Sequence, residues 1–123
     1  MKRILIIDDA ATVRMYHRNI LEAAGYAVEE AVNGVEALEK SLQKPFDLYL
    51  VDINMPKLDG YGFLRELRAQ DMPQAPGIMI STEAESNDHT RAYAAGANAY
   101  LIKPVKPDQL RIHVKLLIGG AQA

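Results

Sequence analysis

The sequence predicts an α/β fold: a doubly wound, five-stranded parallel sheet, for which we adopt 2-1-3-4-5, a common strand order of such folds. Short apolar runs alternate five times with segments whose apolar residues recur at helical spacing. The runs are nearly free of polar residues, as is typical of parallel strands that helices cover on both faces. In this strand order the winding reverses between strands 1 and 3, and ligands bind at their carboxyl ends.

The expected strands are short and end near polar residues. They cover residues 4–7 (ILII), 26–32 (YAVEEAV), 48–51 (LYLV), 78–80 (IMI) and 99–102 (AYLI). Acidic, hydroxyl or lysine side chains follow strands 1, 3, 4 and 5, so we expect the chemistry at that edge of the sheet.

The first three helices carry end signals. Gly25 follows the first, where a helix end favours a left-handed residue. Asn33 can cap the second helix, which Pro45 stops, and Asp59 can cap the third. The expected buried face of the first helix comprises Val13, His17, Ile20, Leu21 and Ala24.

The last two helices should differ in how firmly they are held. Pro107 suits the first turn of the fifth helix, which Gly119 and Gly120 end. The preceding segment, SNDHTRAYAAG, offers only Tyr93 and alanines for burial. We therefore expect the fourth helix to be the most weakly anchored.

Length and composition indicate one globular domain over residues 1–123, with no output domain. Of the 123 residues, 49% are hydrophobic and 24% are charged. The absence of cysteine excludes disulfides, thiolate metal sites and a cysteine nucleophile. The net charge is -2, basic residues are scattered, and no apolar run could span a membrane. We expect a cytoplasmic protein that binds neither nucleic acid nor membrane.

Three acidic residues should meet at the carboxyl edge. Strand 1 ends in Asp8 and Asp9, and strand 3 ends in Asp52. Two carboxylates about 5 Å apart repel by roughly 3 kcal/mol at an effective dielectric near 20, so three together need a cation. Hard oxygen ligands without histidine or cysteine favour Mg²⁺, with Mn²⁺ as a second candidate.

Lys103 after strand 5, and Ser81 and Thr82 after strand 4, should join this edge. Alone, each has an ordinary explanation: Lys103 as a solvated lysine, Ser81 as a turn residue, and Asp9 as a helix cap. Together, acids, cation, lysine and hydroxyl would hold a phosphoryl group. A carboxylate can form an aspartyl phosphate, and Asp52 is the best-placed nucleophile because it lies between the acid pair and Lys103.

Four motifs in this order resemble those of response-regulator receiver domains: DD after strand 1, D-x-N-M-P-x-x-D-G after strand 3, a hydroxyl after strand 4, and K-P after strand 5. The resemblance covers the whole chain and points to a single-domain, CheY-like receiver of flavodoxin-like (βα)5 fold. It implies a stand-alone response regulator of a two-component phosphorelay, monomeric or weakly dimeric, that controls a protein partner. Such a protein is not a conventional enzyme, although it catalyses its own phosphorylation and dephosphorylation.

The resemblance assigns the central roles to the acids. Asp52 would accept a phosphoryl group from a phosphohistidine on a sensor histidine kinase, or from a small phosphodonor. Mg²⁺ would be held by Asp9, Asp52 and the backbone carbonyl of Asn54, and through water by Asp8.

A switch is implied as well. Lys103 would pair with the phosphoryl oxygens, and the peptide bond from Lys103 to Pro104 would be cis, otherwise a minority state. Ser81 would move to hydrogen-bond the phosphoryl group while Tyr100 on strand 5 swings inward. The face formed by the fourth helix, strand 5 and the fifth helix would then change its arrangement.

Other residues bear on the lifetime of the phosphoryl group and on the choice of downstream target. Asn54, Thr82 and Glu83 occupy positions that tune the lifetime of the phosphoryl group in this family. The segment EAESND is acidic where motor-binding chemotaxis proteins tend to carry lysine, which argues against the flagellar motor as the target of a chemotaxis role. The sequence does not separate control of a partner from a phosphate sink that drains a shared kinase.

Two rival functions fit the sequence less well. A haloacid-dehalogenase-like phosphatase using Asp52 needs a second acid two residues on, where this chain has Asn54. A flavodoxin-like FMN binder needs a hydroxyl-rich and glycine-rich loop after strand 1, where DDAAT places two anions. His17, His89 and His113 lie in three different expected helices, so we interpret them as core or surface residues.

Overall fold

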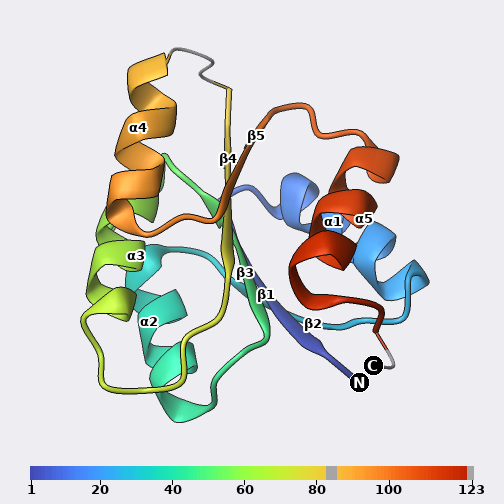
Figure 1. Cartoon of the computed structure of the whole chain (residues 1–123), viewed down its shortest axis with the longest axis horizontal. Coiled ribbons are helices and arrows are strands. Elements are labelled where there is room, and N and C mark those ends of the chain that lie inside the picture. Colours follow the sequence, from blue (N-terminus) through green and yellow to red (C-terminus); the bar gives the residue numbers. More distant parts are fainter. Residues whose placement is uncertain (83–85, 122–123) are drawn as a thin grey trace.

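The structure is a computed structural model that describes residues 1–82 and 86–121 (Figure 1). The strands are β1 (Arg3–Ile7), β2 (Ala27–Ala31), β3 (Leu48–Asp52), β4 (Gly77–Ser81) and β5 (Ala99–Ile102). The helices are α1 (Ala11–Ala23), α2 (Gly34–Gln43), α3 (Gly60–Arg68), α4 (Ser86–Ala95) and α5 (Pro107–Ile118).

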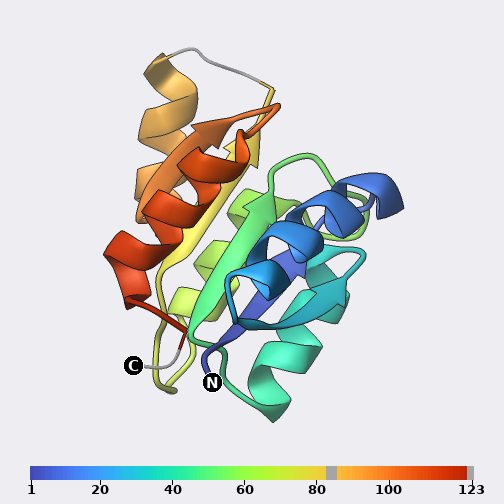
Figure 2. The same cartoon turned by 90° about the vertical axis from the view of Figure 1, so that its right-hand side faces the viewer.

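The strands form one parallel sheet in the order β2-β1-β3-β4-β5, which confirms the predicted topology. Figure 2 shows the strands running in one direction. Ile7 lies opposite Val51, and Asp52 lies opposite Ile80. The last residues of β1, β3 and β4 are therefore nearly level, and the residues that follow them share one edge of the sheet.

Helices cover both faces of the sheet. In Figure 1, α2, α3 and α4 lie on one side and α1 and α5 on the other. Successive strand side chains point to opposite faces, so alternate positions of each strand enter different apolar clusters. The α2–α4 side takes Leu5, Ile7, Tyr49, Val51 and Met79, and the α1–α5 side takes Ile4, Ile6, Leu48, Leu50, Ile78 and Ile80.

The helix ends mostly follow their sequence signals. Asn33 Oδ1 accepts the amide of Glu36 at 2.8 Å, and Asp59 Oδ1 accepts the amide of Gly62 at 2.8 Å. Both predicted caps are thus confirmed. The N-cap of α1 is Ala10 and carries no side-chain bond, so the interpretation of Asp9 as a helix cap is wrong.

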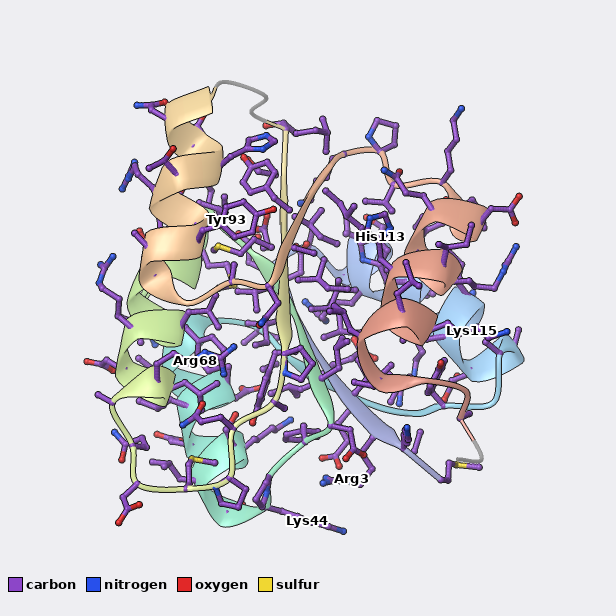
Figure 3. The ribbon with its side chains drawn as sticks, viewed as in Figure 1. Arg3, Lys44, Arg68, Tyr93, His113 and Lys115 are labelled. Carbon is purple, nitrogen blue, oxygen red and sulfur yellow. The ribbon has the colours of Figure 1, made fainter. Side chains whose placement is uncertain are left out.

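Two burial predictions are wrong. Ala24 is exposed because the chain turns at Gly25, whose φ is +96°, and Tyr26 fills the buried position. Tyr93, labelled in Figure 3, is 51% exposed. Helix α4 instead buries Ala92 and Ala95, three residues apart on one helical face, while Tyr93 lies about 100° around the helix from Ala92. Its apolar contact with the core is thus made by small side chains.

Candidate functional site

The three acids meet at the edge where the winding reverses. Carboxylate oxygens of Asp8, Asp9 and Asp52 all lie within 4.8 Å of one another. Asp8 and Asp52 are buried, whereas Asp9 is exposed. The sheet sets the positions of the two buried acids, because Asp8 comes directly after β1 and Asp52 is the last residue of the neighbouring β3.

Lys103 links two of these acids. Its ammonium Nζ donates to Asp52 Oδ1 at 2.9 Å and to Asp8 Oδ2 at 3.2 Å. Its backbone amide donates to the carbonyl of Ser81 at 2.7 Å, and the peptide bond from Lys103 to Pro104 is cis. The end of β5 thus brings a cation directly against the carboxylates at the ends of β1 and β3.

The site is electrostatically strained. Burial raises the pKa of Asp52 above its usual value, the charges of Asp8 and Asp9 raise it further, and the hydrogen bond from Lys103 opposes them. Burial disfavours the Lys103 ammonium, but the hydrogen bond and charge of Asp52, with those of Asp8, outweigh it, so the pKa of Lys103 is raised. Lys103 pairs with two acids of a group of three, which leaves negative charge for a bound cation to neutralise.

The donors suit a hard divalent cation. Mg²⁺ binds oxygen at about 2.0–2.1 Å in near-octahedral geometry and keeps several waters. Carboxylate oxygens spread over up to 4.8 Å fit a set in which one acid reaches the ion through water. Asn54 is exposed and lies in the loop after β3, two residues along the chain from Asp52.

Three further predicted residues, Ser81, Thr82 and Tyr100, lie on or directly after β4 and β5. Ser81 is buried as the last residue of β4, and Thr82 is exposed beside it. Tyr100 is already buried on β5, and its ring stacks on that of His89 from α4, with centroids 4.1 Å apart and planes 29° apart. Glu83 lies outside the described residues.

Sequence reasoning missed the place of His17. It is only 3% exposed and lines a cavity of about 380 Å³ beside Lys103, together with Thr12, Val13, Tyr16, Thr82, Pro104 and Val105. Burial lowers the pKa of His17 to about 4, against the raising effect of Asp8. Its position on the apolar face of the first helix signalled burial, but no sequence signal placed it next to Lys103.

His113, labelled in Figure 3, lies on α5. Its Nδ1 is hydrogen-bonded to the carbonyl of Gln109 at 2.8 Å. The group of potential metal ligands found within the described ranges consists of the three acids and includes no histidine. In the same part of the chain, no helix has the length and apolar character to cross a membrane.

An acid triad joined to a lysine at the carboxyl edge of a 2-1-3-4-5 sheet defines a receiver-type site. The family model for the response regulator receiver domain matches residues 4–115. The chain is 36% identical over 119 residues to the transcriptional regulatory protein ResD of Bacillus subtilis, covering 97% of this chain and 49% of that protein. It thus spans about half the length of that relative.

Solved structures agree with the sequence comparison. The chemotaxis protein CheY4 of Vibrio cholerae superposes with a TM-score of 0.89 at 33% identity, covering 95% of this chain and 98% of that one. The receiver domain of a Pseudomonas aeruginosa sensor histidine kinase, solved with a magnesium ion in its active-site cleft, also gives a TM-score of 0.89, at 31% identity over 97% and 98% of the two chains. This chain belongs to the response-regulator receiver family.

Proposed function

We propose that Asp52 accepts a phosphoryl group from a phosphohistidine on a sensor histidine kinase, in the presence of Mg²⁺. The observation that carries this proposal is the pair of hydrogen bonds from Lys103 Nζ, 2.9 Å to Asp52 and 3.2 Å to Asp8. The Lys103 ammonium already lies between two carboxylates at the edge of the sheet. It can therefore pair with the negative charge of an incoming phosphoryl group.

The transfer requires no other covalent group from this chain. An oxygen of the Asp52 carboxylate attacks phosphorus, and the bond from phosphorus to the donor nitrogen breaks, leaving the donor imidazole to take up a proton. Oδ1 of Asp52 is the atom that Lys103 now holds. As this oxygen or its neighbour becomes the bridging oxygen of the acyl phosphate, Lys103 can pair with a phosphoryl oxygen, because Nζ has three donors.

The metal would be held by Asp8, Asp9, Asp52 and the carbonyl of Asn54. When bound, it supplies charge neutralisation for the phosphoryl oxygens and the acids. The raised pKa of Asp52 shows how far burial and neighbouring charge oppose an ionised nucleophile. The hydrogen bond and charge of Lys103 work in the opposite direction and favour the ionised form of Asp52.

Phosphorylation would act on the face formed by α4, β5 and α5 to control a protein partner. Ser81 and Tyr100 are buried on adjacent strands, where Ser81 lies opposite Ile102 and Tyr100 lies opposite Met79. Among the described residues, α4 buries mainly alanines and Asp88. Movement of Ser81 toward a phosphoryl group would therefore alter a side-chain arrangement that few large apolar contacts hold in place.

The comparisons support a sensor histidine kinase as a partner. One structural neighbour is itself the receiver domain of a sensor histidine kinase, and another is a chemotaxis protein. We propose the cytoplasm as the location, since histidine kinases draw phosphate from ATP. Asn54, Thr82 and Glu83 are proposed to tune the lifetime of the phosphoryl group.

Labelling by a small phosphodonor tests the proposal. Incubation with acetyl phosphate and Mg²⁺ should add one phosphoryl group to the wild-type chain, and removal of Mg²⁺ with a chelator should prevent it. Asp52→Asn should abolish labelling, while the same change at the acid that precedes β3, Asp47→Asn, should not affect it. Equal labelling of wild type and Asp52→Asn would contradict the assignment of Asp52.

A further inference from the structure

The proposed metal ligands lie in two stretches of the chain. The segment of residues 31–35, which joins β2 to α2, contacts the first of these stretches at Asp8. The amide of Asp8 donates to the carbonyl of Ala31 at 3.1 Å. This bond continues the pairing of β1 with β2 past the last strand residue. The segment is thus fixed directly to the backbone of a buried acid of the site.

The other end of the segment reaches the second ligand-bearing stretch, the loop of residues 53–59. The amides of Gly34 and Val35, in the first turn of α2, donate to the carbonyls of Leu58 and Lys57 at 3.1 and 3.2 Å. In Figure 1, α2 and α3 lie on the same face of the sheet, and this loop leads into α3. The first amides of a helix lack partners within it, so these carbonyls are favourable acceptors.

Only glycine fits at position 34. A Cβ built there would lie 2.3 Å from the carbonyl oxygen of Leu58, 2.9 Å from its Cβ and 3.0 Å from its carbonyl carbon. Two of these atoms belong to the backbone, so a rotamer change of Leu58 cannot relieve the contact. A larger residue at position 34 must displace either the start of α2 or the loop.

The loop is held in an unfavourable conformation by these contacts. Lys57 and Leu58 have φ values of +50° and +80°, which non-glycine residues rarely adopt. Such conformations persist when the surrounding structure imposes them. At the other end of the loop, the amide of Gly60 donates to the carbonyl of Ile53 at 2.9 Å, so the loop that contains Asn54 is fixed from both sides.

We propose that Gly34 is a positioning residue for the metal site. By allowing the start of α2 to approach the loop, it fixes the spacing between Asp8 and the backbone of Asn54. This inference rests on the proposed function, which makes that carbonyl a ligand. Mg²⁺ tolerates little departure from octahedral geometry, and partners that orient ligands without touching the ion typically change metal affinity by about 10–100-fold when altered.

Metal binding by Gly34→Ala tests the proposal. Mn²⁺ is the probe, read as the loss of free-ion signal in electron paramagnetic resonance, with Mg²⁺ added as competitor. We expect Gly34→Ala to bind at least about 10-fold more weakly than wild type while keeping its far-ultraviolet circular dichroism. Unchanged affinity in the folded variant would overturn the proposal.

Gly62→Ala is the matched control. Gly62 also lies in the first turn of a helix against Leu58, but its added Cβ would meet the flexible side-chain end, Cδ1, at 2.5 Å. It should therefore bind Mn²⁺ much like wild type. An equal loss in both variants would overturn the specific role of Gly34.

A measurement on the wild-type chain covers the case in which Gly34→Ala does not fold. Saturating Mg²⁺ should slow hydrogen exchange of the Gly34 and Val35 amides, because a ligated loop holds their acceptors in place. The Glu36 amide, bonded to Asn33, should change less. Unchanged exchange at Gly34 and Val35 would overturn the inference alone, whereas failure of the wild type to bind either metal would overturn the proposed metal site as well.

Discussion

The ammonium nitrogen of Lys103 lies 2.9 Å from Oδ1 of Asp52, at the ends of β5 and β3, two strands separated in the sheet by β4. The contact spans the sheet because Lys103 follows the end of β5 and its amide donates to the carbonyl of Ser81. Its side chain can then extend past β4 to the acids. This relationship makes the stability of the fold depend on the charges of the site.

Removal of the Lys103 charge should destabilise the fold at neutral pH. Lys103→Met leaves Asp8 and Asp52 without their ammonium partner, and breaking a buried ion pair costs several kcal/mol. Because the Lys103 side chain is 21% exposed, we expect a smaller loss of roughly 2 kcal/mol in the free energy of unfolding. Urea denaturation measures this loss, and added Mg²⁺ should recover part of it. A variant as stable as wild type would show that the contact carries little free energy.

Asp52→Asn should have the opposite effect. Because the pKa of Asp52 is raised in the fold, its ionised form destabilises the native state above that pKa, and the neutral amide removes this cost. The variant should melt at a higher temperature at pH 7. The gain should shrink as the pH falls through the raised pKa of Asp52 and should vanish below the ordinary aspartate value of 3.8, since the wild-type acid is then neutral in both states. A lower melting temperature at pH 7 would contradict this account.

His17 should make stability depend on pH in mildly acid solution. Its folded-state pKa of about 4 lies below the ordinary value of 6.5, so the unfolded chain takes up a proton first as the pH falls. Stability should decline from about pH 6.5 to pH 4, by about 3 kcal/mol in total. His17→Leu should remove most of this decline in urea denaturation series, and His113→Leu should not. Parallel pH profiles for wild type and His17→Leu would contradict the prediction.

His89 should hold the ring of Tyr100 in its buried position. The two rings stack at 4.1 Å, and aromatic pairs of this kind contribute about 0.5–1.5 kcal/mol beyond burial. Nuclear magnetic resonance measures the effect of His89→Ala. The ring protons of Tyr100 should lose the upfield shift caused by the imidazole, and the ring should be more accessible to solvent. Tyr93→Ala, an exposed aromatic on the same helix, serves as the control. Unchanged Tyr100 resonances in His89→Ala would show that the stack is absent in solution.

The fold and the centre of the site were predictable because both depend on sequence periodicity and strand ends. Apolar runs defined the strands, and the reversal of winding placed Asp8 and Asp52 together. The caps at Asn33 and Asp59 were predictable because capping is a local interaction within three residues. These features need no knowledge of side-chain distances across the fold.

The features that sequence reasoning missed depend on contacts between distant segments. The stack of His89 on Tyr100 joins a helix to a strand, and the fit of Gly34 against Leu58 joins the first turn of α2 to the loop before α3. The errors at Ala24 and Tyr93 arose where the chain leaves a helix and where two neighbouring residues competed for one buried face. The local sequence pattern cannot show which of two neighbouring residues is buried, because a small alanine fits a buried position as well as a larger ring does.

Reductive trapping of the phosphorylated chain tests the central claim most directly. Borohydride converts an aspartyl phosphate to homoserine, so peptide mass spectrometry locates the phosphorylated residue. After phosphotransfer from a sensor histidine kinase in the presence of Mg²⁺, we predict homoserine at position 52 alone, with Asp8 and Asp9 unchanged. Homoserine at position 8 or 9, or a phosphoryl group that survives borohydride on another side chain, would contradict the account.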